Sequence, residues 1–433
     1  MSLDWHRHLL LCSLLCAAMP AVPETTIDVV GGEGRQIPIA LLPFAGEAGR
    51  ATEQQVKAVV AQDLARSGWF RIVGSDPAHA AAPETGAPDF AMLRNEGAQV
   101  ALSGAVSENS GMLETRIDVL DVGKRGSLLN DRFMARPDRQ RRTGHRIADR
   151  VHEALTGRRG AFDTRICYVA RDEGLSRLVV ADMDGHDPRT LYSASGPIVS
   201  PQWSPDGKNI VYVSLEYKKP VVYVHRLEDG TRKLIARFHG SNFSPAWSPD
   251  GQKLALALSK EGGSQIFVMN AEGEDLQRLV ISRSRDSEPN FSPDGRRLLF
   301  SSDRSGSPQI YELKLDSQEA PRRLTFEGSY NTSPRYSPDG RFFAFVHFSD
   351  GRYNIATQDM ESGKMRLVTS GRDDRSPSFA PNGDAILYIA ESRDGSVLSA
   401  TTADGRVNWT LPADSRSLRT PAWGPFITSH SGD

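Results

Sequence analysis

The sequence predicts two domains: a small N-terminal mixed α/β domain, then a C-terminal all-β six-bladed propeller closed by the C-terminal strand. Three observations carry this prediction. An aromatic motif returns six times at nearly constant spacing, short apolar runs fill the intervals, and the last copy has no strands after it. Repeats of about this length, with four strands each, are typical of propeller blades.

The repeated motif has the form Ser-Pro-x-aromatic-Ser-Pro-Asp-Gly. Its aromatic residue recurs at intervals of 44, 44, 45, 43 and 44 residues, at Trp203, Trp247, Phe291, Tyr336, Phe379 and Trp423. The Pro-Asp-Gly part predicts a tight turn, because proline presets φ and glycine accepts a conformation that other residues disfavour. The last two copies depart from the pattern at Asn382 and Gly424.

Three more strands are predicted in each blade. The second strands are apolar runs, as expected where neighbouring blades cover both faces, at 166–170, 210–214, 254–258, 298–302, 342–346 and 386–390. The third strands are expected at 178–182, 221–225, 265–270, 309–314, 353–358 and 396–401. The outermost strands have basic flanks that discourage pairing with other molecules, at 189–192, 232–235, 277–280, 322–325, 365–369 and 407–411.

The phase of the repeats predicts how the ring closes. The first blade has three strands between Ile166 and Tyr192 but no aromatic motif before them, whereas the motif at Trp423 has no strands after it. We therefore expect the strand around 421–423 to complete the first blade, so that six copies of every strand balance. Closure also removes free sheet edges.

The N-terminal part divides into three segments. Residues 1–21 resemble a secretory signal, with Arg7 before an apolar run and small residues at the end. Cys12 and Cys16 lie in that run, which leaves Cys167 as a buried structural thiol. Residues 22–36 contain a short β-prone stretch and a Gly31-Gly32 hinge, so we expect a mobile segment, either a frayed end, which the sequence slightly favours, or a portable recognition strand.

Residues 37–160 are expected to form the α/β domain. Predicted strands are 37–44, 70–73, 99–107, 112–121 and 127–135, and predicted helices begin at Thr52, with a Thr52/Gln55 capping box, at Asp89, and at Thr143. Residues 75–88 are a predicted loop. The propeller is expected over 161–426, and 427–433 is a predicted disordered tail.

Composition and motifs favour a binding protein over an enzyme. A formal charge of −2 over 433 residues gives no general attraction to nucleic acid or anionic membranes. The apolar run in the N-terminal segment, residues 9–19, has eleven residues, which is too few to span a bilayer. The sequence lacks nucleophile-elbow, phosphate-loop and zinc motifs. The propeller histidines, His186, His225, His239 and His347, lie at different phases, so we expect no metal, no cofactor and no catalytic residue.

The residue directly before the first proline of each motif copy is more informative. These residues are expected to ring the mouth of the central channel: Ser200, Ser244, Glu288, Ser333, Ser376 and Thr420. Adjoining loops are predicted to carry Asn242 and Phe243, Arg285 and Asp286, 330–332, and 373–375. The hydroxyls either satisfy backbone groups or bind a partner; function often lies on such loops.

The ordered set of features resembles the TolB family, the soluble periplasmic component of the Tol-Pal system in Gram-negative envelopes. The resemblance rests on the strand IPIALLPF, the junction GAFDTRICYV and the SPxWSPDG repeats ending in PAWGP, and it covers nearly the whole chain. It implies a non-catalytic periplasmic protein that links the outer-membrane lipoprotein Pal to inner-membrane TolA. Such a protein would support outer-membrane integrity and envelope invagination during cell division, without inserting in the membrane, and we expect a monomer.

The resemblance also implies where the partners bind. For Pal, on the channel face, it implies Asn242, Phe243, Ser244, Ser287, Glu288, Thr332, Ser333, Arg375 and Ser376. For TolA it implies Thr25, Thr26, Ile27, Asp28, Val29 and Val30. We further hypothesise that Pal binding shifts the N-terminal strand between docked and free arrangements. Glu288→Ala is expected to weaken Pal binding with little effect on the melting temperature.

The alternative from another class is a secreted propeller hydrolase or lyase. A peptidase of the oligopeptidase type needs a second α/β domain, and only a few residues follow Trp423. A metal-dependent lyase needs histidines at one phase of the repeat, which this chain does not have.

Overall fold

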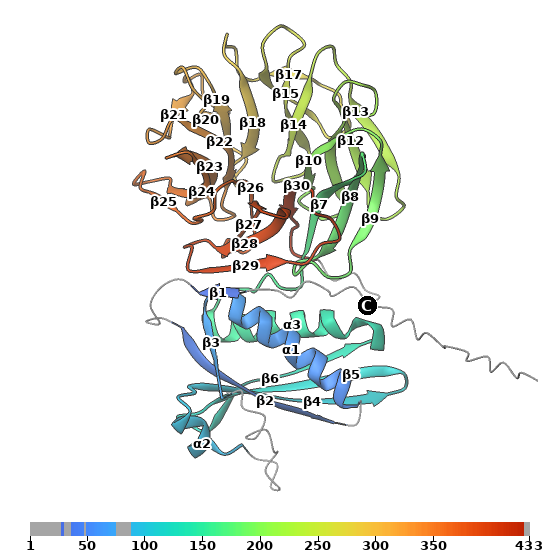
Figure 1. The fold of residues 1–433 in the computed structure, drawn as a ribbon, viewed down its shortest axis with the longest axis vertical. Helices are drawn as coiled ribbons and strands as arrows, with labels where there is room; N and C mark the ends of the chain where they lie inside the picture. The colour runs from blue at the N-terminus through green and yellow to red at the C-terminus, as the bar shows by residue number, and fades with distance from the viewer. Residues whose placement is uncertain (1–26, 30–35, 47–48, 75–87, 428–433) are drawn as a thin grey trace, which may run out of the picture.

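The computed structural model describes residues 27–29, 36–46, 49–74 and 88–427. The predicted signal segment, Cys12, Cys16, the loop at 75–87 and residues 428–433 lie outside the described residues. Figure 1 shows a ring of strands above a smaller α/β domain. The predicted fold class, with its two domains in this order, is confirmed.

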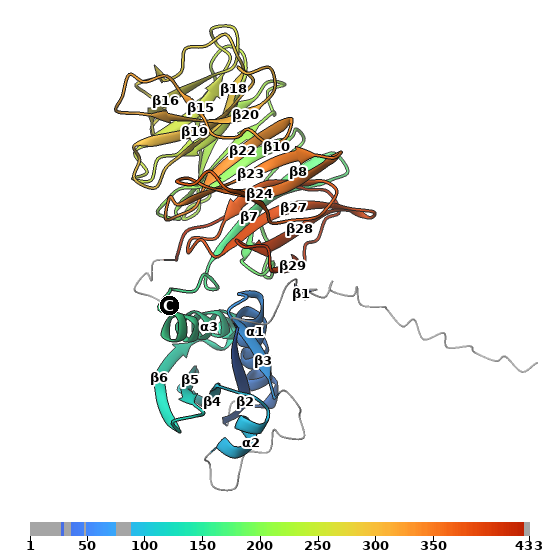
Figure 2. The ribbon, with the colours of Figure 1, turned by 90° about the vertical axis from the view of Figure 1, so that its left-hand side faces the viewer.

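The α/β domain is a five-stranded sheet with strand order β3-β2-β4-β5-β6. Strand β2 runs parallel to β3 and β4, and β5 and β6 continue the sheet antiparallel. Helices α1 and α3 pack together and lie between this sheet and the propeller (Figure 2). The elements are β2 (Ile37–Gly46), α1 (Arg50–Arg66), β3 (Phe70–Val73), α2 (Phe90–Asn95), β4 (Val100–Asn109), β5 (Met112–Asp121), β6 (Gly126–Ala135), the 3-10 helix η2 (Pro137–Arg139) and α3 (Gln140–Thr156).

The helix starts differ in part from the predictions. The Asp89 cap is confirmed, because its carboxylate accepts from the backbone N–H groups of Ala91 and Met92. The capping box at Thr52 is wrong: α1 begins two residues earlier, after Gly49 with φ of 94°, and has no side-chain cap. Helix α3 begins at Gln140 rather than Thr143, because η2 already turns the chain.

Within the described residues the propeller has six blades of four strands, which follow one another from the channel outward. Blade 1 is β30 (Leu418–Trp423), β7 (Arg165–Asp172), β8 (Leu175–Asp182) and β9 (Arg189–Ala194). Blade 2 is β10 (Ile198–Trp203), β11 (Asn209–Ser214), β12 (Val221–Arg226) and β13 (Arg232–Ala236). Blade 3 is β14 (Asn242–Trp247), β15 (Lys253–Leu258), β16 (Gln265–Asn270) and β17 (Gln277–Arg278).

The remaining blades follow the same plan. Blade 4 is β18 (Asp286–Phe291), β19 (Arg297–Ser302), β20 (Gln309–Lys314) and β21 (Arg322–Arg323). Blade 5 is β22 (Tyr330–Tyr336), β23 (Phe342–Ser349), β24 (Arg352–Asp359) and β25 (Met365–Leu367). Blade 6 is β26 (Asp374–Phe379), β27 (Ala385–Ser392), β28 (Gly395–Thr402) and β29 (Val407–Leu411).

The C-terminal strand closes the ring as predicted. Strand β30 pairs antiparallel with β7, placing Ala422 opposite Cys167 and Trp423 opposite Ile166. The indole Nε1 of Trp423 donates to Thr164 Oγ1 at 2.9 Å, and its backbone N–H donates to Ser378 Oγ at 2.9 Å. The closing strand is therefore bonded to both neighbouring parts of the ring.

A continuous apolar core joins the two domains. It runs from Val60 on α1 and Val151 on α3, through Phe162 of the linker, to Trp409 and Trp423 of the propeller. Because burial of apolar surface is the main favourable term in association, this shared core fixes the α/β domain against blades 1 and 6.

Candidate protein-binding face

The six residues that precede the repeated prolines line one small cavity in the channel. This cavity has a volume of about 60 Å³ and is lined by Ser200, Ser244, Glu288, Ser333, Ser376 and Thr420. The structure therefore brings together all six residues that the sequence placed in a ring. They occupy equal positions because every blade repeats the same strand pattern.

All six residues have a left-handed backbone, with φ between 40° and 58°. Such values are uncommon for residues other than glycine. At this point the register between each inner strand and its neighbour shifts, as between Ser287 and Asn290 in blade 4, which marks a β-bulge. A bulge of this kind re-aims a side chain. The sequence carries no glycine at these positions, so turn chemistry did not reveal the bulge.

Glu288, the single acid of the ring, links two blades. Its Oε2 accepts from the backbone N–H of Ser333 at 2.8 Å and from Ser301 Oγ at 2.7 Å, and its Oε1 accepts from Ser333 Oγ at 2.6 Å. The carboxylate is thus held by three donors from blades 4 and 5. Because these donors would lose their acceptor, the structure predicts a larger effect of Glu288 removal on stability than the sequence analysis expected.

Arg335 brings a positive charge to the same cavity. Burial lowers the pKa of its guanidinium, while the Glu288 carboxylate raises it. Its Nη1 also donates to the carbonyl of Pro334 at 2.8 Å. Sequence reasoning missed this residue, because the corresponding position in the other blades is neutral.

The residues assigned to the adjoining loops lie mostly in strands. Asn242 and Phe243 begin β14, Thr332 lies in β22, and Arg375 lies in β26. Asn242 is fully buried. Its side-chain oxygen accepts from the backbone N–H of Phe238, and its side-chain NH2 group donates to the carbonyls of Phe238 and Pro220, both at 3.1 Å. It therefore shapes the turn and cannot be a direct contact.

Other predicted residues remain accessible on this face. Phe243, Ser287 and Thr332 are half-buried. Arg375 is exposed, lies 3.8 Å from the Tyr353 ring centroid and pairs with Asp373. We call the face on which the inner strands begin the channel face; the opposite face, with the Pro-Asp-Gly turns, contacts the α/β domain through the Arg158–Asp384 pair.

Two large apolar side chains on the channel face were not foreseen. Ile281 is 80% exposed and Phe326 is 73% exposed. Each lies seven residues before the ring residue of its blade, Glu288 and Ser333, so they occupy equivalent positions on neighbouring blades. Large exposed apolar side chains on one face are a feature of protein contact sites. The sequence could have revealed this pair, because both apolar residues fall at the same position of the repeat, seven residues before the ring residue.

The N-terminal strand docks on the propeller. Strand β1 (Ile27–Val29) pairs antiparallel with β29, the outermost strand of blade 6, with Asp28 opposite Asn408. The sequence favoured an undocked end here, and for these three residues the structure differs because β29 offers a free edge. Figure 1 shows β1 between the propeller and the α/β domain. Thr25, Thr26 and Val30 lie outside the described residues.

A buried cluster of charges joins α1, α3 and blade 1. The Nδ1 atom of His145 on α3 is 2.6 Å from Asp63 on α1, and its Nε2 is 3.6 Å from Asp184, after β8. Burial alone would lower the pKa of His145, but Asp63 and Asp184 raise it to about 9. Arg141 also donates to Asp184, so this carboxylate ties the propeller to the α/β domain.

The same cluster has metal-ligand spacing. His145, Asp182 and Asp184 offer ligand atoms within 4.8 Å of one another, the only such group in the described part of the chain. None of the four propeller histidines weighed from the sequence belongs to it. As the structure stands, His145 is paired with Asp63 and Asp184, and Arg141 is paired with Asp184, so the group forms an ion-pair cluster.

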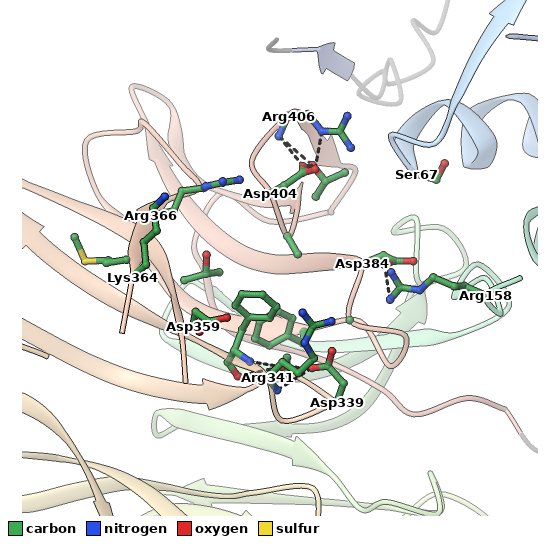
Figure 3. Close-up of a pocket in the computed structure, with 18 of the residues that line it drawn as sticks. Ser67, Arg158, Asp339, Arg341, Asp359, Lys364, Arg366, Asp384, Asp404 and Arg406 are labelled. Atoms are coloured by element: carbon green, nitrogen blue, oxygen red, sulfur yellow. Dashed lines mark hydrogen bonds and ion pairs between the residues drawn. The ribbon is translucent and has the colours of Figure 1, made fainter. Parts of the chain in front are cut away.

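A polar cavity of about 440 Å³ lies between the α/β domain and blades 5 and 6 (Figure 3). Arg158 pairs with Asp384 across it at 2.8 Å, and Arg406 pairs with Asp404 at 2.6 Å. Burial raises the pKa of Asp384 to about 6, against the charge of Arg158. The Arg158–Asp384 pair adds a second polar link between the domains, whereas the Arg406–Asp404 pair lies within blade 6.

Comparisons with known proteins identify the family. The model of the "TolB beta propeller domain" matches residues 152–427, and that of the "TolB amino-terminal domain" matches residues 25–128. The chain belongs to the TolB family. No helix in the described part of the structure has the length and apolar character needed to cross a membrane.

Relatives in the TolB family match over nearly their whole length. The chain is 48% identical to a Tol-Pal system protein TolB of Methylobacillus flagellatus, covering 93% of each chain, and 43% identical to that of Bordetella avium, covering 96% of this chain and 94% of the relative. The crystal structure of TolB from Acinetobacter baumannii superposes with a TM-score of 0.85 at 34% identity, covering 93% of this chain and 100% of that one. The chain is thus a Tol-Pal system component.

Proposed function

We propose that this TolB family member links Pal to TolA in the periplasm, without catalysis, and so supports outer-membrane integrity and envelope invagination during cell division. The observation that carries the proposal is the channel face. It combines a ring of polar side chains around Glu288 with the exposed apolar residues Ile281 and Phe326. Apolar anchors around a polar centre are typical of protein interfaces.

The proposal assigns Pal to the channel face, with Glu288, Ser333 and Ser376 at its centre and Phe243, Ser287, Thr332 and Arg375 around them. It assigns TolA to the N-terminal segment that contains β1. Against the alternative of a hydrolase or lyase, the described residues contain one free thiol, Cys167, which is buried. Burial raises the pKa of this thiol, which makes it a poor nucleophile.

We expect Glu288→Gln to weaken Pal binding by about 2 kcal/mol or more, which is roughly thirtyfold, because a buried charge at an interface centre commonly carries this much. We also expect a modest fall in the melting temperature, because Ser333 and Ser301 lose a charged hydrogen-bond acceptor. Calorimetry with purified Pal measures the effect.

The matched control is Asp294→Asn, in the same blade but in the Pro-Asp-Gly turn of the opposite face. Asp294 also accepts from a neighbouring serine and a backbone N–H, so the local loss is similar. Equal Pal affinity for the wild type and Glu288→Gln would show that Glu288 is only structural.

We also expect saturating Pal to change TolA affinity by about 5- to 150-fold, the usual range for coupling between two sites. The physical basis is the three-residue docking of β1, which is short enough to be reversible. Calorimetry of TolA binding with and without Pal tests this. A disulfide between Asp28→Cys and Asn408→Cys, which lie opposite each other, should abolish the difference. Identical TolA affinities in the unmodified protein would contradict the coupling.

A further inference from the structure

A second interdomain pocket lies beside blades 1 and 2. Its volume is about 600 Å³, and it is lined by the start of α3, the linker, and residues of both blades. Trp203, Leu227 and Phe426 supply apolar surface. The charged side chains of the lining are balanced, with five basic residues, Arg139, Arg142, Arg165, Arg189 and Lys208, and five acidic ones, Asp163, Asp182, Asp187, Asp206 and Glu228. This volume is within the range of organic ligand sites, roughly 300 to 1,000 Å³.

Arg165, at the start of β7, is partly buried without a counter-ion. Its guanidinium carbon lies 5.2 Å from the Trp203 ring centroid. Among the described residues its guanidinium has no hydrogen bond or ion pair. Burial lowers its pKa, and the charges of Arg189 and Arg142 lower it further, with smaller opposing effects from Asp182 and Asp163. Partly buried charges are normally paired, so this one is unusual.

Two of the acids that line the pocket are engaged elsewhere. Asp163 accepts from Nε of Arg142 at 3.0 Å. Asp206 accepts from the hydroxyl of Ser204 and from the backbone N–H of Lys208 at 3.0 Å, inside its own turn. No ion pair joins Arg165 to these two acids or to Asp182, Asp187 and Glu228, the other acids of the described lining, so its guanidinium is free to meet an anion from outside.

We propose that this pocket binds an acidic peptide segment of a partner protein, with a carboxylate on Arg165 and a neighbouring apolar side chain against Trp203 and Leu227. A planar guanidinium matches a carboxylate with two parallel hydrogen bonds. The apolar wall favours a peptide over a free inorganic anion. The site is separate from the channel face and from β1, so it does not depend on the assignments of Pal and TolA.

Calorimetry with the full chain and the peptide acetyl-Gly-Glu-Leu-Glu-Gly-amide tests the proposal, with inorganic phosphate as the second probe. Arg165→Gln should weaken peptide binding about ten- to a hundredfold, as expected for loss of charge-assisted hydrogen bonds. Arg171→Gln, an exposed arginine at the far end of the same strand, should leave the affinity unchanged. Melting temperatures of both variants show whether they remain folded.

The outcomes separate clearly. No peptide binding, or equal binding by wild type and Arg165→Gln, would overturn the proposal. Phosphate binding as tightly as the peptide would overturn the peptide assignment in favour of a simple anion site. If Arg165→Gln does not fold, Arg189→Gln at the pocket rim replaces it, with an expected loss of about threefold from one weaker, exposed charge contact. An unchanged affinity in that variant would also contradict the proposal.

Discussion

We expect His145→Ala to lower the free energy of unfolding by about 3 kcal/mol, because it removes a buried cation that both Asp63 and Asp184 face. The figure follows from the raised pKa of His145, from 6.5 to about 9, at about 1.4 kcal/mol per unit. It agrees with the loss of roughly 3 to 5 kcal/mol when one partner of a buried pair is removed. Urea unfolding at pH 6 measures it.

The pH dependence of that loss has a definite sign. A group with a raised pKa in the folded protein stabilises it in full below the unfolded pKa, here 6.5, and this contribution is lost as the pH rises through about 9. The difference between wild type and variant should therefore be largest below pH 6.5 and shrink towards pH 9. His225→Ala is the control, because burial lowers the pKa of His225, so the effect of this variant should not shrink as the pH rises towards 9. A flat profile for His145→Ala would contradict a protonated imidazole.

Trp423→Ala should lower the free energy of unfolding by about 3 to 5 kcal/mol, the usual loss for a buried tryptophan. Trp423 is 7% exposed, packs in the core shared by the two domains and bonds Thr164 and Ser378. Because it lies on the closing strand, its loss should also let β30 leave β7. Cys167, opposite Ala422, reports that opening, since the thiol is fully buried in the closed ring.

Thiol labelling of native protein carrying Cys12→Ser and Cys16→Ser measures ring opening. In Trp423→Ala the labelling rate of Cys167 should rise about 100- to 4,000-fold, in line with the loss of stability. Trp247→Ala is the matched control, because Trp247 holds the same position in blade 3, away from the closure. Equal labelling rates in both variants would show that β30 does not act as a separate latch.

The channel ring was predictable because the blades repeat. Residues at one phase of a repeat must lie at one radius, so Ser200, Glu288 and Ser376 meet even though they are far apart in the chain. The same logic placed Trp423 beside the first blade. The repeat pattern did not reveal that Asn242 is buried, because its burial depends on hydrogen bonds to the carbonyls of Pro220 and Phe238.

The sequence by itself determined the domain order, the six blades, the closing strand and the set of side chains in the channel, since each follows from local patterns that recur. Tertiary structure alone decided the docking of β1 on β29, the left-handed bulges, the His145 cluster and the free guanidinium of Arg165. The pair of His145 and Asp63, for example, joins residues 82 positions apart. Such contacts arise where two surfaces of the fold meet, and no local pattern of residues records which surfaces those are.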